Sequence, residues 1–426
     1  MTNYKGTNVK LIKCGKLFDG IHDELFENME ILVNKDKIEA VGRDLPHPED
    51  VEVIDLSDAT VTPGMIDSHT HLQVFDWHHA KDERIFQNQA SHNLAVLYNA
   101  QKALKRGFTA LRHMGSKTFD NYAALEAKRA INAGYFPGAR LCVLPYTMVT
   151  TGSHGDLSQS AYMNPPLAKY LCSDFPTMGN GPDFFRGAVR EQVKYGADFV
   201  KIMSGGGFST PNDTPDDEQM SDDEMRAVIE TAHQVHKKCT AHVYTAKSIK
   251  KLCEMGIDEL QHCHLMDEEA LEALYKYNVP IVPTFSPFED MYESDPASMA
   301  QKSPSWQRKQ LLYGERMMKG REMVAKSHLT LGYGSDLVSV YQPYQGAVEY
   351  RNMFKAGIDP FRILKAATSV NAKLMEMDDI IGSIEPGKLA DIAAWKSDLL
   401  TDPNALLDCA FVMKDGKVFE TEAFDD

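Results

Sequence analysis

Basic residues are outnumbered in this chain of 426 residues: 45 Lys and Arg stand against 61 Asp and Glu, a net charge of −16. This balance argues against nucleic-acid binding, which needs a face rich in Lys and Arg. Long apolar runs are also lacking. No segment approaches the roughly 18 apolar residues of a membrane helix, and residues 1–5 lack the apolar core of a signal peptide. We therefore expect neither a nucleic-acid partner nor a membrane span.

Cysteine is equally sparse. The seven cysteines are odd in number, widely scattered and without any Cys-x-x-Cys motif, which suits reduced thiols better than a disulfide framework. A hydrophobic fraction of 43% with 25% charged residues is ordinary for a globular protein. The sequence thus predicts a cytoplasmic globular protein with two or three domains, or with one large barrel and a smaller attachment.

Both ends of the chain have the pattern of short β-strands. Residues 29–34 and 37–42 flank a Lys35-Asp36 turn, which is a hairpin signal. Residues 391–395 and 410–413 are short apolar runs near the other end, and an Asp-Gly turn follows them. We predict one small β domain assembled from both termini, although two unrelated extensions would give the same pattern.

Strand and helix patterns alternate between these ends. Apolar runs of four to seven residues recur near positions 65, 109, 141, 199, 241, 259, 281 and 330. A helical pattern over residues 221–238 begins with a capping box of Ser221 and Glu224. Alternation predicts an α/β fold with parallel strands, and eight strands predict a (β/α)₈ TIM barrel. Residues 285–327 form either a helical insertion over one end of the barrel or two ordinary amphipathic helices.

Two histidines open the series of candidate site residues. His69 and His71 stand at i and i+2 of a predicted strand, so their imidazoles project from the same face. Two neutral imidazoles placed together can bind one divalent metal ion. Alone, the pattern is explained as well by chance or by exposure to solvent.

Lys201 is unusual because it lies inside an apolar strand, residues 197–203. A buried lysine is unfavourable unless it is paired or neutralised, and burial lowers its pKa and frees the amine for chemistry. Phe199, Lys201 and Met203 share a face, so we expect the lysine to point inward. The alternative is a lysine at the strand end that reaches solvent or pairs with Asp198.

Later strands end in further candidates. His242 and His262 end consecutive strands twenty residues apart, which suits neighbours in a barrel. His264 shares the face of His262 if the strand continues, so spacing does not decide which of them is a ligand. Asp336 follows His69 by 267 residues, close to the roughly 250 of a barrel whose active site lies at the strand C-termini. A carboxylate there could bind metal and move protons.

These motifs, in this order, resemble the amidohydrolase superfamily, and within it the imidazolonepropionase-like and Xaa-Pro dipeptidase (prolidase) branch. The segments that carry the resemblance are residues 62–71, 151–156, 197–203, 241–242, 261–262, 334–336 and 382–391. The last of them resembles the family's return into a small β-sandwich. The resemblance thus implies a composite β-sandwich domain of residues 1–62 and 380–426, and a barrel domain of residues 63–379.

The resemblance also implies two divalent metal ions, most often zinc. Lys201 would carry CO₂ as a carbamate that bridges the ions. His69, His71 and Asp336 would hold one ion, and His242 and His262 the other. Asp336 would take a proton from the attacking water and pass it to the leaving amine. A homo-oligomer is implied by the resemblance alone.

For substrate contacts the resemblance points to His154 and Tyr244, which match residues thought to contact the substrate carbonyl or carboxylate in the dipeptidase branch. A surface histidine and a packed tyrosine are the alternatives. Arg112 could pair with a substrate carboxylate, but a structural salt bridge is the simpler interpretation. His78 and His79 fall outside every motif and are expected in a surface loop, and the acidic run from Asp213 to Glu224 is expected to be solvated.

The chain departs from the family pattern at two places. His113 follows Arg112 where relatives usually have aspartate, and residues 261–264 read Gln-His-Cys-His instead of the common Ile-Glu-His-Gly or Ile-Glu-His-Ala order. Both changes leave the predicted metal ligands intact. The roles of His113, Cys263 and His264 stay open.

The predicted function is the hydrolysis of an amide bond in a small-molecule substrate, by a dipeptidase of the Xaa-Pro type or an N-acyl-amino-acid hydrolase. Hydrolysis of a cyclic, imidazolone-like amide or deamination is the alternative. Deaminases of this superfamily usually bind one metal and lack the carbamate lysine, so Lys201 counts against them. A non-catalytic scaffold on the same fold is a third interpretation, against which the complete ligand set counts.

Overall fold

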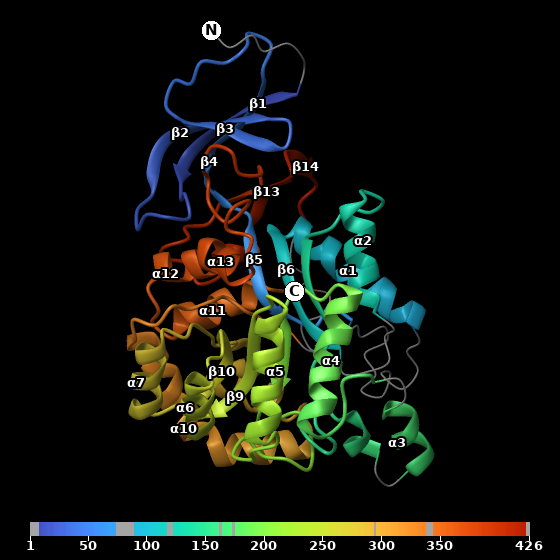
Figure 1. The fold of residues 1–426 in the computed structure, drawn as a ribbon. Helices are drawn as coiled ribbons and strands as arrows, with labels where there is room; N and C mark the ends of the chain where they lie inside the picture. The colour runs from blue at the N-terminus through green and yellow to red at the C-terminus, as the bar shows by residue number, and fades with distance from the viewer. Residues whose placement is uncertain are drawn as a thin grey trace.

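The computed structural model describes residues 8–73, 89–116, 122–161, 164–172, 175–293, 295–337 and 344–422. Figure 1 shows the N-terminal strands at one end of the molecule, the C-terminal strands next to them, and the strands and helices of the middle of the chain at the other end. Within the described ranges, none of the helices is both long enough and apolar enough to span a membrane.

Strands from both ends of the chain form one mixed sheet in the order β14-β13-β12-β4-β1-β2-β3. They are β1 (Val9–Leu17), β2 (Phe26–Asn34), β3 (Lys37–Gly42), β4 (Glu52–Pro63), β12 (Ile392–Trp395), β13 (Cys409–Lys414) and β14 (Lys417–Phe419). β2 and β3 form the predicted hairpin, with Lys35 in the left-handed region at φ 58°. Ile392 of β12 lies opposite Pro63 of β4, so both ends share this sheet. The division of the chain into two domains stays a prediction.

The middle of the chain builds two parallel sheets, in the orders β5-β6-β7 and β11-β10-β9-β8. Their strands are β5 (Met65–Thr70), β6 (Phe108–Ser116), β7 (Arg140–Tyr146), β8 (Val200–Met203), β9 (Cys239–Thr245), β10 (Glu259–Leu265) and β11 (Ile281–Val282). Helices separate most of these strands, as the alternating pattern predicted, so the mixed α/β class is confirmed.

The helices that accompany these strands differ widely in length. They are α1 (Gln89–Lys105), α2 (Ala123–Asn132), α3 (Pro165–Cys172), α4 (Pro182–Tyr195), α5 (Asp222–Gln234), α6 (Ala246–Glu254), α7 (Glu268–Tyr277), α8 (Glu289–Tyr292), α9 (Pro296–Met299), α10 (Pro304–Lys326), α11 (Ala347–Lys355), α12 (Pro360–Lys365) and α13 (Asn371–Leu374). α5 begins with the predicted capping box of Ser221 and Glu224. It ends earlier than predicted, at Gln234, and His236 just beyond it has a φ of 56°.

The predicted strand near residue 330 is reduced to a single bridge between Ile281 and Leu331. Asn371 accounts for part of this, because its side-chain oxygen accepts from Tyr333 N at 3.1 Å and so withdraws that N–H from a strand ladder. The side-chain nitrogen of Asn371 also donates to Tyr333 O at 2.7 Å. Backbone contacts still join the sheets, including Ser68 N to Tyr333 O at 2.8 Å and Met148 N to Lys201 O at 2.9 Å. The sheets themselves do not confirm a closed barrel of eight strands.

The described part of residues 285–327 contains three α-helices and a short 3-10 helix, and α10 is by far the longest of them. α10 packs closely on β10, because a Cβ at Gly320 would lie 2.0 Å from the backbone oxygen of His264. This contact brings the helix next to the residues that β9 and β10 contribute to the candidate site.

Candidate metal centre and substrate site

Three predicted ligands come together where β5 ends. The ligand atoms of His69, His71 and Asp336 all lie within 4.8 Å of one another. Asp336 Oδ1 is 3.3 Å from His69 Nε2 and 3.4 Å from His71 Nε2. The alternation of a strand puts both imidazoles on one face, as the sequence predicted. Asp336 arrives from the segment that lies beside β5, where its own N–H donates to His69 O at 2.7 Å.

The hydrogen bonds on the far side of these rings fix their tautomers. His69 Nδ1 is 2.6 Å from Gln261 Oε1, and His71 Nδ1 is 3.3 Å from Gly115 O. Both partners are acceptors, so each Nδ1 carries the proton and each Nε2 presents a lone pair to Asp336. The amide of Gln261 is oriented by its own partners, since its nitrogen faces the Glu259 carboxylate and Thr240 Oγ1.

Burial keeps His69 neutral. The ring is fully buried, and this desolvation, together with the charge of nearby Lys201, lowers the pKa of His69 to about 3. Two imidazole nitrogens and a carboxylate oxygen converge here, an arrangement that a bound cation stabilises. The residues present fit a divalent metal ion at this point.

Of the other three predicted ligands, Lys201 and His262 approach these atoms, whereas His242 packs on the ring of His262 and its Nε2 lies 3.3 Å from Gly206 O. Lys201 Nζ, at the buried end of β8, lies 3.3 Å from His69 Nε2. The rings of His242 and His262 lie 4.6 Å apart between centroids, and His262 Nδ1 is 4.0 Å from Asp336 Oδ2. His262 Nε2 is buried and has no hydrogen-bond partner among the described residues, so it too suits a metal ligand. Asp198, the alternative partner of Lys201, pairs with Lys128 at 2.6 Å instead.

Backbone strain accompanies this convergence. His262, Cys263 and Asp336 have φ of 71°, 61° and 45°, a region that L-residues seldom adopt and that is typical of functional sites. Asp67 secures the strained segment around Asp336, because its Oδ1 accepts from His69 N and from Ser335 N, both at 3.0 Å. Burial raises the pKa of Asp67 to about 6 despite these bonds.

The same strain bears on the choice between His262 and His264, which the spacing in the sequence left open. The positive φ values at residues 262 and 263 break the alternation of β10, whose pairing with β9 shifts register there. His264 Nε2 turns instead to Pro283 O, and its ring packs against Phe285 and Phe288. His262, by contrast, faces Asp336. Sequence spacing could not separate the two.

Both residues predicted to contact substrate pack on the rings of predicted metal ligands. His154 stacks on His242 with centroids 4.6 Å apart and planes at 13°. Tyr244 stacks on His262 with centroids 5.1 Å apart and planes at 14°. Burial raises the pKa of the Tyr244 hydroxyl well above its usual value, so the phenol stays protonated. His154, from the loop after β7, and Tyr244, from β9, thus lie beside the predicted metal ligands.

Arg112 and His113 occupy the interior of β6. Arg112 forms a buried salt bridge with Glu259, which is the structural role that the sequence favoured. Leu72 N donates to His113 Nδ1 at 3.3 Å, and the ring centroid of His113 lies 6.4 Å from that of His71. Burial lowers the pKa of His113 well below its usual value. His78 and His79 lie outside the described residues.

Sequence reasoning missed the supporting residues of the site. Asp213 was expected in a solvated acidic run, but it is 3% exposed and contacts both His154 and Lys309. Nothing in the sequence links Asp213 to a lysine 96 residues away. Gln261 departs from the family pattern, and this departure is the feature of the sequence that points to its contact with His69.

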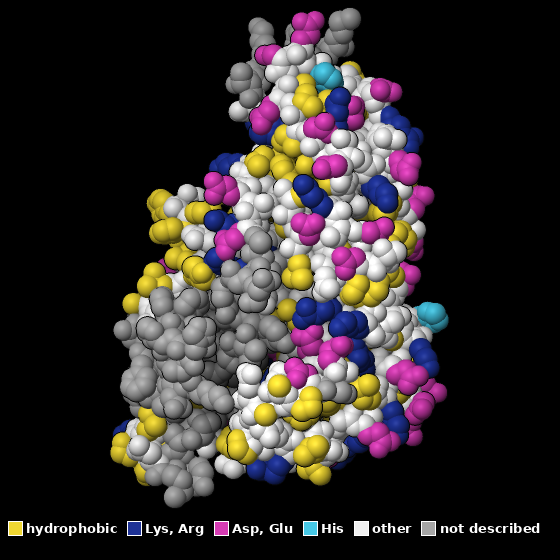
Figure 2. All heavy atoms as spheres, turned by 180° about the vertical axis from the view of Figure 1, so that it is seen from behind, with side chains coloured by type: hydrophobic (Ala, Val, Ile, Leu, Met, Phe, Trp, Pro, Cys, Tyr) yellow, Lys and Arg dark blue, Asp and Glu magenta, His cyan; other side chains and the backbone are white. Residues whose placement is uncertain are grey.

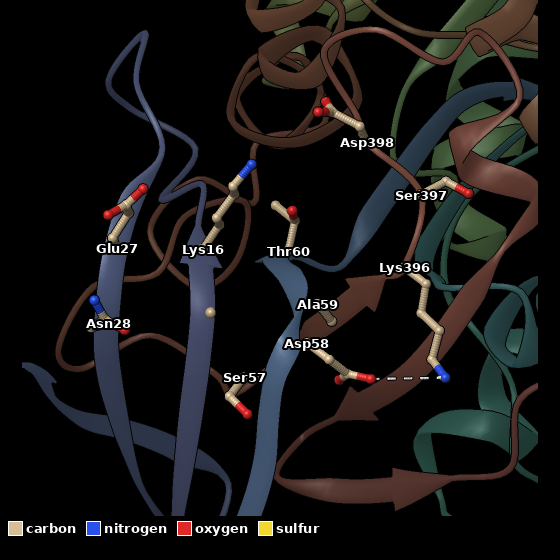
Figure 3. A pocket seen from close by; sticks show the side chains of 11 residues that line it. Lys16, Glu27, Asn28, Ser57, Asp58, Ala59, Thr60, Lys396, Ser397 and Asp398 are labelled. Atoms are coloured by element: carbon tan, nitrogen blue, oxygen red, sulfur yellow. Dashed lines mark ion pairs between the residues drawn. The ribbon is translucent and has the colours of Figure 1, made fainter.

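A surface hollow of about 430 Å³ lies on the terminal sheet, among residues of β1, β2, β4 and residues 396–398 (Figure 3). None of the predicted metal ligands lines it. Its charges are of both signs and solvent-exposed, with Lys396 4.0 Å from Asp58. Figure 2 shows Lys and Arg side chains interspersed with Asp and Glu over the described part of the rear face.

Comparison with known proteins identifies the family of this chain. The amidohydrolase family matches residues 60–419. Ochratoxinase of Aspergillus niger is 25% identical over 97% of this chain and 87% of its own length. An imidazolonepropionase of Fusobacterium nucleatum is 26% identical over 87% of this chain and 86% of its own. The crystal structure of a Xaa-Pro dipeptidase with bound methionine superposes with a TM-score of 0.86 at 27% identity, over 97% of this chain and all of that one. The chain therefore belongs to the amidohydrolase family and is a hydrolase.

Proposed function

We propose that the chain is a metal-dependent hydrolase of amide bonds that acts on dipeptides or on N-acyl amino acids. The observation that carries the proposal is the convergence of two imidazole lone pairs on the Asp336 carboxylate. Lys201 lies 3.3 Å from His69 Nε2, His262 lies 4.0 Å from Asp336, and the ring of His242 packs on that of His262. Family membership supports the reaction class, because amidohydrolases generally use metal ions and include hydrolases of amide bonds.

The proposal extends to the fold that carries the site. The two parallel sheets and the segment 331–336 would together make one (β/α)₈ barrel, linked by the Met148–Ile202 and Ile281–Leu331 bridges. The barrel would span residues 63–379, and residues 1–62 with 380–426 would make the composite β-sandwich. A site at the carboxyl ends of the strands is what this barrel predicts.

Two divalent ions, zinc being our first candidate, would occupy the site. His69, His71 and Asp336 would hold one, His242 and His262 the other, and Lys201 as a carbamate would bridge them. When bound, such ions lower the pKa of a water molecule and polarise the scissile carbonyl. The buried amine of Lys201, 3.3 Å from His69 Nε2, is the group that would carry the carbamate.

The side chains of the protein then carry the proton. Asp336 would accept a proton from the attacking water and deliver it to the leaving amine, a contribution of about 10²–10⁴-fold in rate. His154 and the protonated hydroxyl of Tyr244 would orient the carbonyl or the carboxylate of the substrate. Because the surrounding residues are buried, each such contact is made with little competition from water.

The choice of a linear amide over a cyclic one rests on the relatives. The Xaa-Pro dipeptidase structure and ochratoxinase each match 97% of the chain. An imidazolonepropionase also matches 87% of the chain, so hydrolysis of a cyclic amide is the second candidate.

A hydrolysis screen on zinc-loaded protein tests the proposal. Its panel holds Xaa-Pro and other dipeptides, N-acyl amino acids and cyclic amides, with products read by mass spectrometry, and the Asp336→Asn variant is the matched control. Cleavage of dipeptides or acyl amino acids by the wild type alone is the expected result. Turnover of cyclic amides only would move the function to the second candidate.

A further inference from the structure

Helix α10 lies along the loop that follows β8, and one face of the helix makes the contacts. Ser305 Oγ donates to Pro211 O at 3.2 Å, and Tyr313 Oη donates to Asp216 Oδ2 at 2.9 Å. Lys309 lies between them and also reaches the loop. Residues 305, 309 and 313 are spaced by four and therefore share a face of the helix. This face of α10 holds the loop in place.

Lys309 is the buried member of that face. It is 5% exposed, and its Nζ donates to Gly207 O at 2.7 Å, to Thr210 O at 2.5 Å and to Asp213 Oδ1 at 2.8 Å. An ammonium group has three N–H donors, and here each of them has an acceptor. A buried charge is stable only when it is paired and hydrogen-bonded in this way.

Asp213 connects Lys309 to His154. Its Oδ2 lies 3.1 Å from His154 Nδ1. Burial alone would raise the pKa of Asp213, but the contacts with His154, Lys309 and Thr210 outweigh it and lower that pKa. An ionised carboxylate can only accept, so Nδ1 of His154 carries the proton and Nε2 is the atom turned away from Asp213.

The ring of His154 is enclosed on its other sides. It stacks on His242 at 4.6 Å, and a Cβ at Gly207 would lie 2.5 Å from its Cε1. Glycine is therefore required at position 207, because any larger residue would displace the ring. Asp213 and Thr210 Oγ1, which is 2.8 Å from Nδ1, hold one edge of the ring, and Ser209 Oγ lies 3.3 Å from Nε2, so the ring has a single orientation.

We propose that Asp213 is a positioning residue that, held by Lys309 of α10, fixes His154 for contact with the substrate. The inference rests on the proposed function, in which His154 contacts the substrate. It also gives α10 a role, since the helix supplies the cation that orients Asp213. Neither residue touches the reacting atoms.

A double-mutant cycle of Asp213→Asn and His154→Ala tests the inference. It is read as KM and kcat on the best linear amide and, separately, as the melting temperature of the protein. Each single change should raise KM by about 10-fold, the value of one charge-assisted hydrogen bond, with a smaller change in kcat. The double variant should raise KM no further, and its loss in melting temperature should be less than the sum of the single losses.

Arg316→Met is the matched control, because Arg316 is half exposed and contacts Asp216 from the same helix. Arg316→Met removes one positive charge from α10, as a Lys309→Met change would, and it should leave KM unchanged. Lys309→Met combined with Asp213→Asn removes both buried charges and should match the KM of Asp213→Asn alone. A wild-type KM in the Asp213→Asn variant, or full additivity of the cycle in both measurements, would overturn the inference.

The two proposals fail separately. If the wild type cleaves no amide of the panel, the proposed function fails, and the melting temperatures alone decide whether Asp213 and His154 are coupled. If the wild type is active and the cycle is additive in both measurements, the function stands and the positioning role falls.

Discussion

Gln261 determines which nitrogen of His69 is available to a metal ion. Its Oε1 accepts from Nδ1 of His69 at 2.6 Å, while its own nitrogen is engaged by Thr240 and Glu259. Partners of this kind fix the tautomer and orientation of a ligand, and their loss lowers metal affinity by about 10–100-fold.

We therefore expect Gln261→Leu to weaken zinc binding by about 10–100-fold, because His69 loses its acceptor. Competition with a fluorescent chelator measures the affinity. Thr240→Val is the control, since it removes the contacts of Thr240 Oγ1 with Gln261 and with Glu259 O but leaves the bond between Gln261 and His69. Equal affinity in the Leu variant and the wild type would show that Gln261 does not orient the ligand.

Lys201→Ala should lower metal binding and activity more than the loss of Gln261, which only contacts a metal ligand. If Lys201 bridges two ions as a carbamate, its loss should reduce bound metal below two per chain and lower kcat/KM by more than the roughly 10–100-fold typical of outer partners. Elemental analysis of purified protein measures the first effect and the amide assay the second. Lys128→Ala, whose lysine pairs with Asp198 away from the site, should change neither. A variant with two metals and full rate would rule out the carbamate.

Single site residues could be predicted from the sequence where a polar side chain stands at a position within an apolar strand. His69, His71 and Lys201 are polar residues on apolar strands, and the structure brings them together. Asp213 and Lys309 gave no such signal, because their pairing depends on a helix and a loop that only the folded chain brings together. The orientation of His264 depends on two positive φ values, which no residue preference of His262 or Cys263 announces.

At the scale of secondary-structure elements, helix α10 packs directly on strand β10. A Cβ at Gly320 would lie 2.0 Å from His264 O, whereas one at Gly314 would meet only Met291 Sδ, at 3.5 Å. The two glycines thus differ in packing while they share one helix.

Gly320→Ala should push α10 away from β10 and destabilise the protein by about 1–3 kcal/mol, as overpacking does. Gly314→Ala should instead be neutral or stabilise it by about 0.5–1 kcal/mol, because alanine favours the helix and finds ordinary contact. Urea unfolding of both variants measures the difference. A loss of stability in Gly314→Ala equal to that in Gly320→Ala would contradict this account of the packing.

Local signals decided how far each element could be predicted. The Lys35-Asp36 turn and the Ser221–Glu224 capping box are short-range features, and both have the predicted structure. The strand near residue 330 could not be judged in this way. Tyr333 N bonds to the Asn371 side chain, 38 residues later, and Tyr333 O accepts from Asn371 and from Ser68 N, so these long-range partners leave no local pattern.

For the molecule as a whole, one buried carboxyl makes stability depend on pH. Glu349 of α11 is fully buried, and this burial raises its pKa to about 8 even though it accepts from Phe285 N and from Ser286 N and Oγ. The folded state thus keeps a proton that the unfolded chain releases near its ordinary pKa of 4.5. Stability is lost as pH rises from about 4.5 to 8.

Glu349→Gln should remove this dependence. The free energy of unfolding of the wild type should fall, relative to that of the variant, by about 1.4 kcal/mol per pH unit between pH 5 and 8. Urea unfolding of both proteins at pH 5, 6, 7 and 8 measures the difference. A constant difference across this range would show that Glu349 is ionised in the folded protein.

The two termini illustrate what whole-chain pattern could and could not provide. Short apolar runs and turns at both ends of the chain predicted a common β unit, and β12 does pair with β4. The order of the seven strands could not be predicted, because it depends on which edge of β4 the returning chain joins.

A metal titration of stripped enzyme tests the central claim most directly. Protein treated with chelator is given zinc in small steps, and hydrolysis of its best amide substrate is measured at each step. We predict no activity without metal and a rise that saturates at two zinc ions per chain, with no such rise in the Asp336→Asn variant. Full activity in the stripped protein, or saturation without hydrolysis of any amide, would contradict the account.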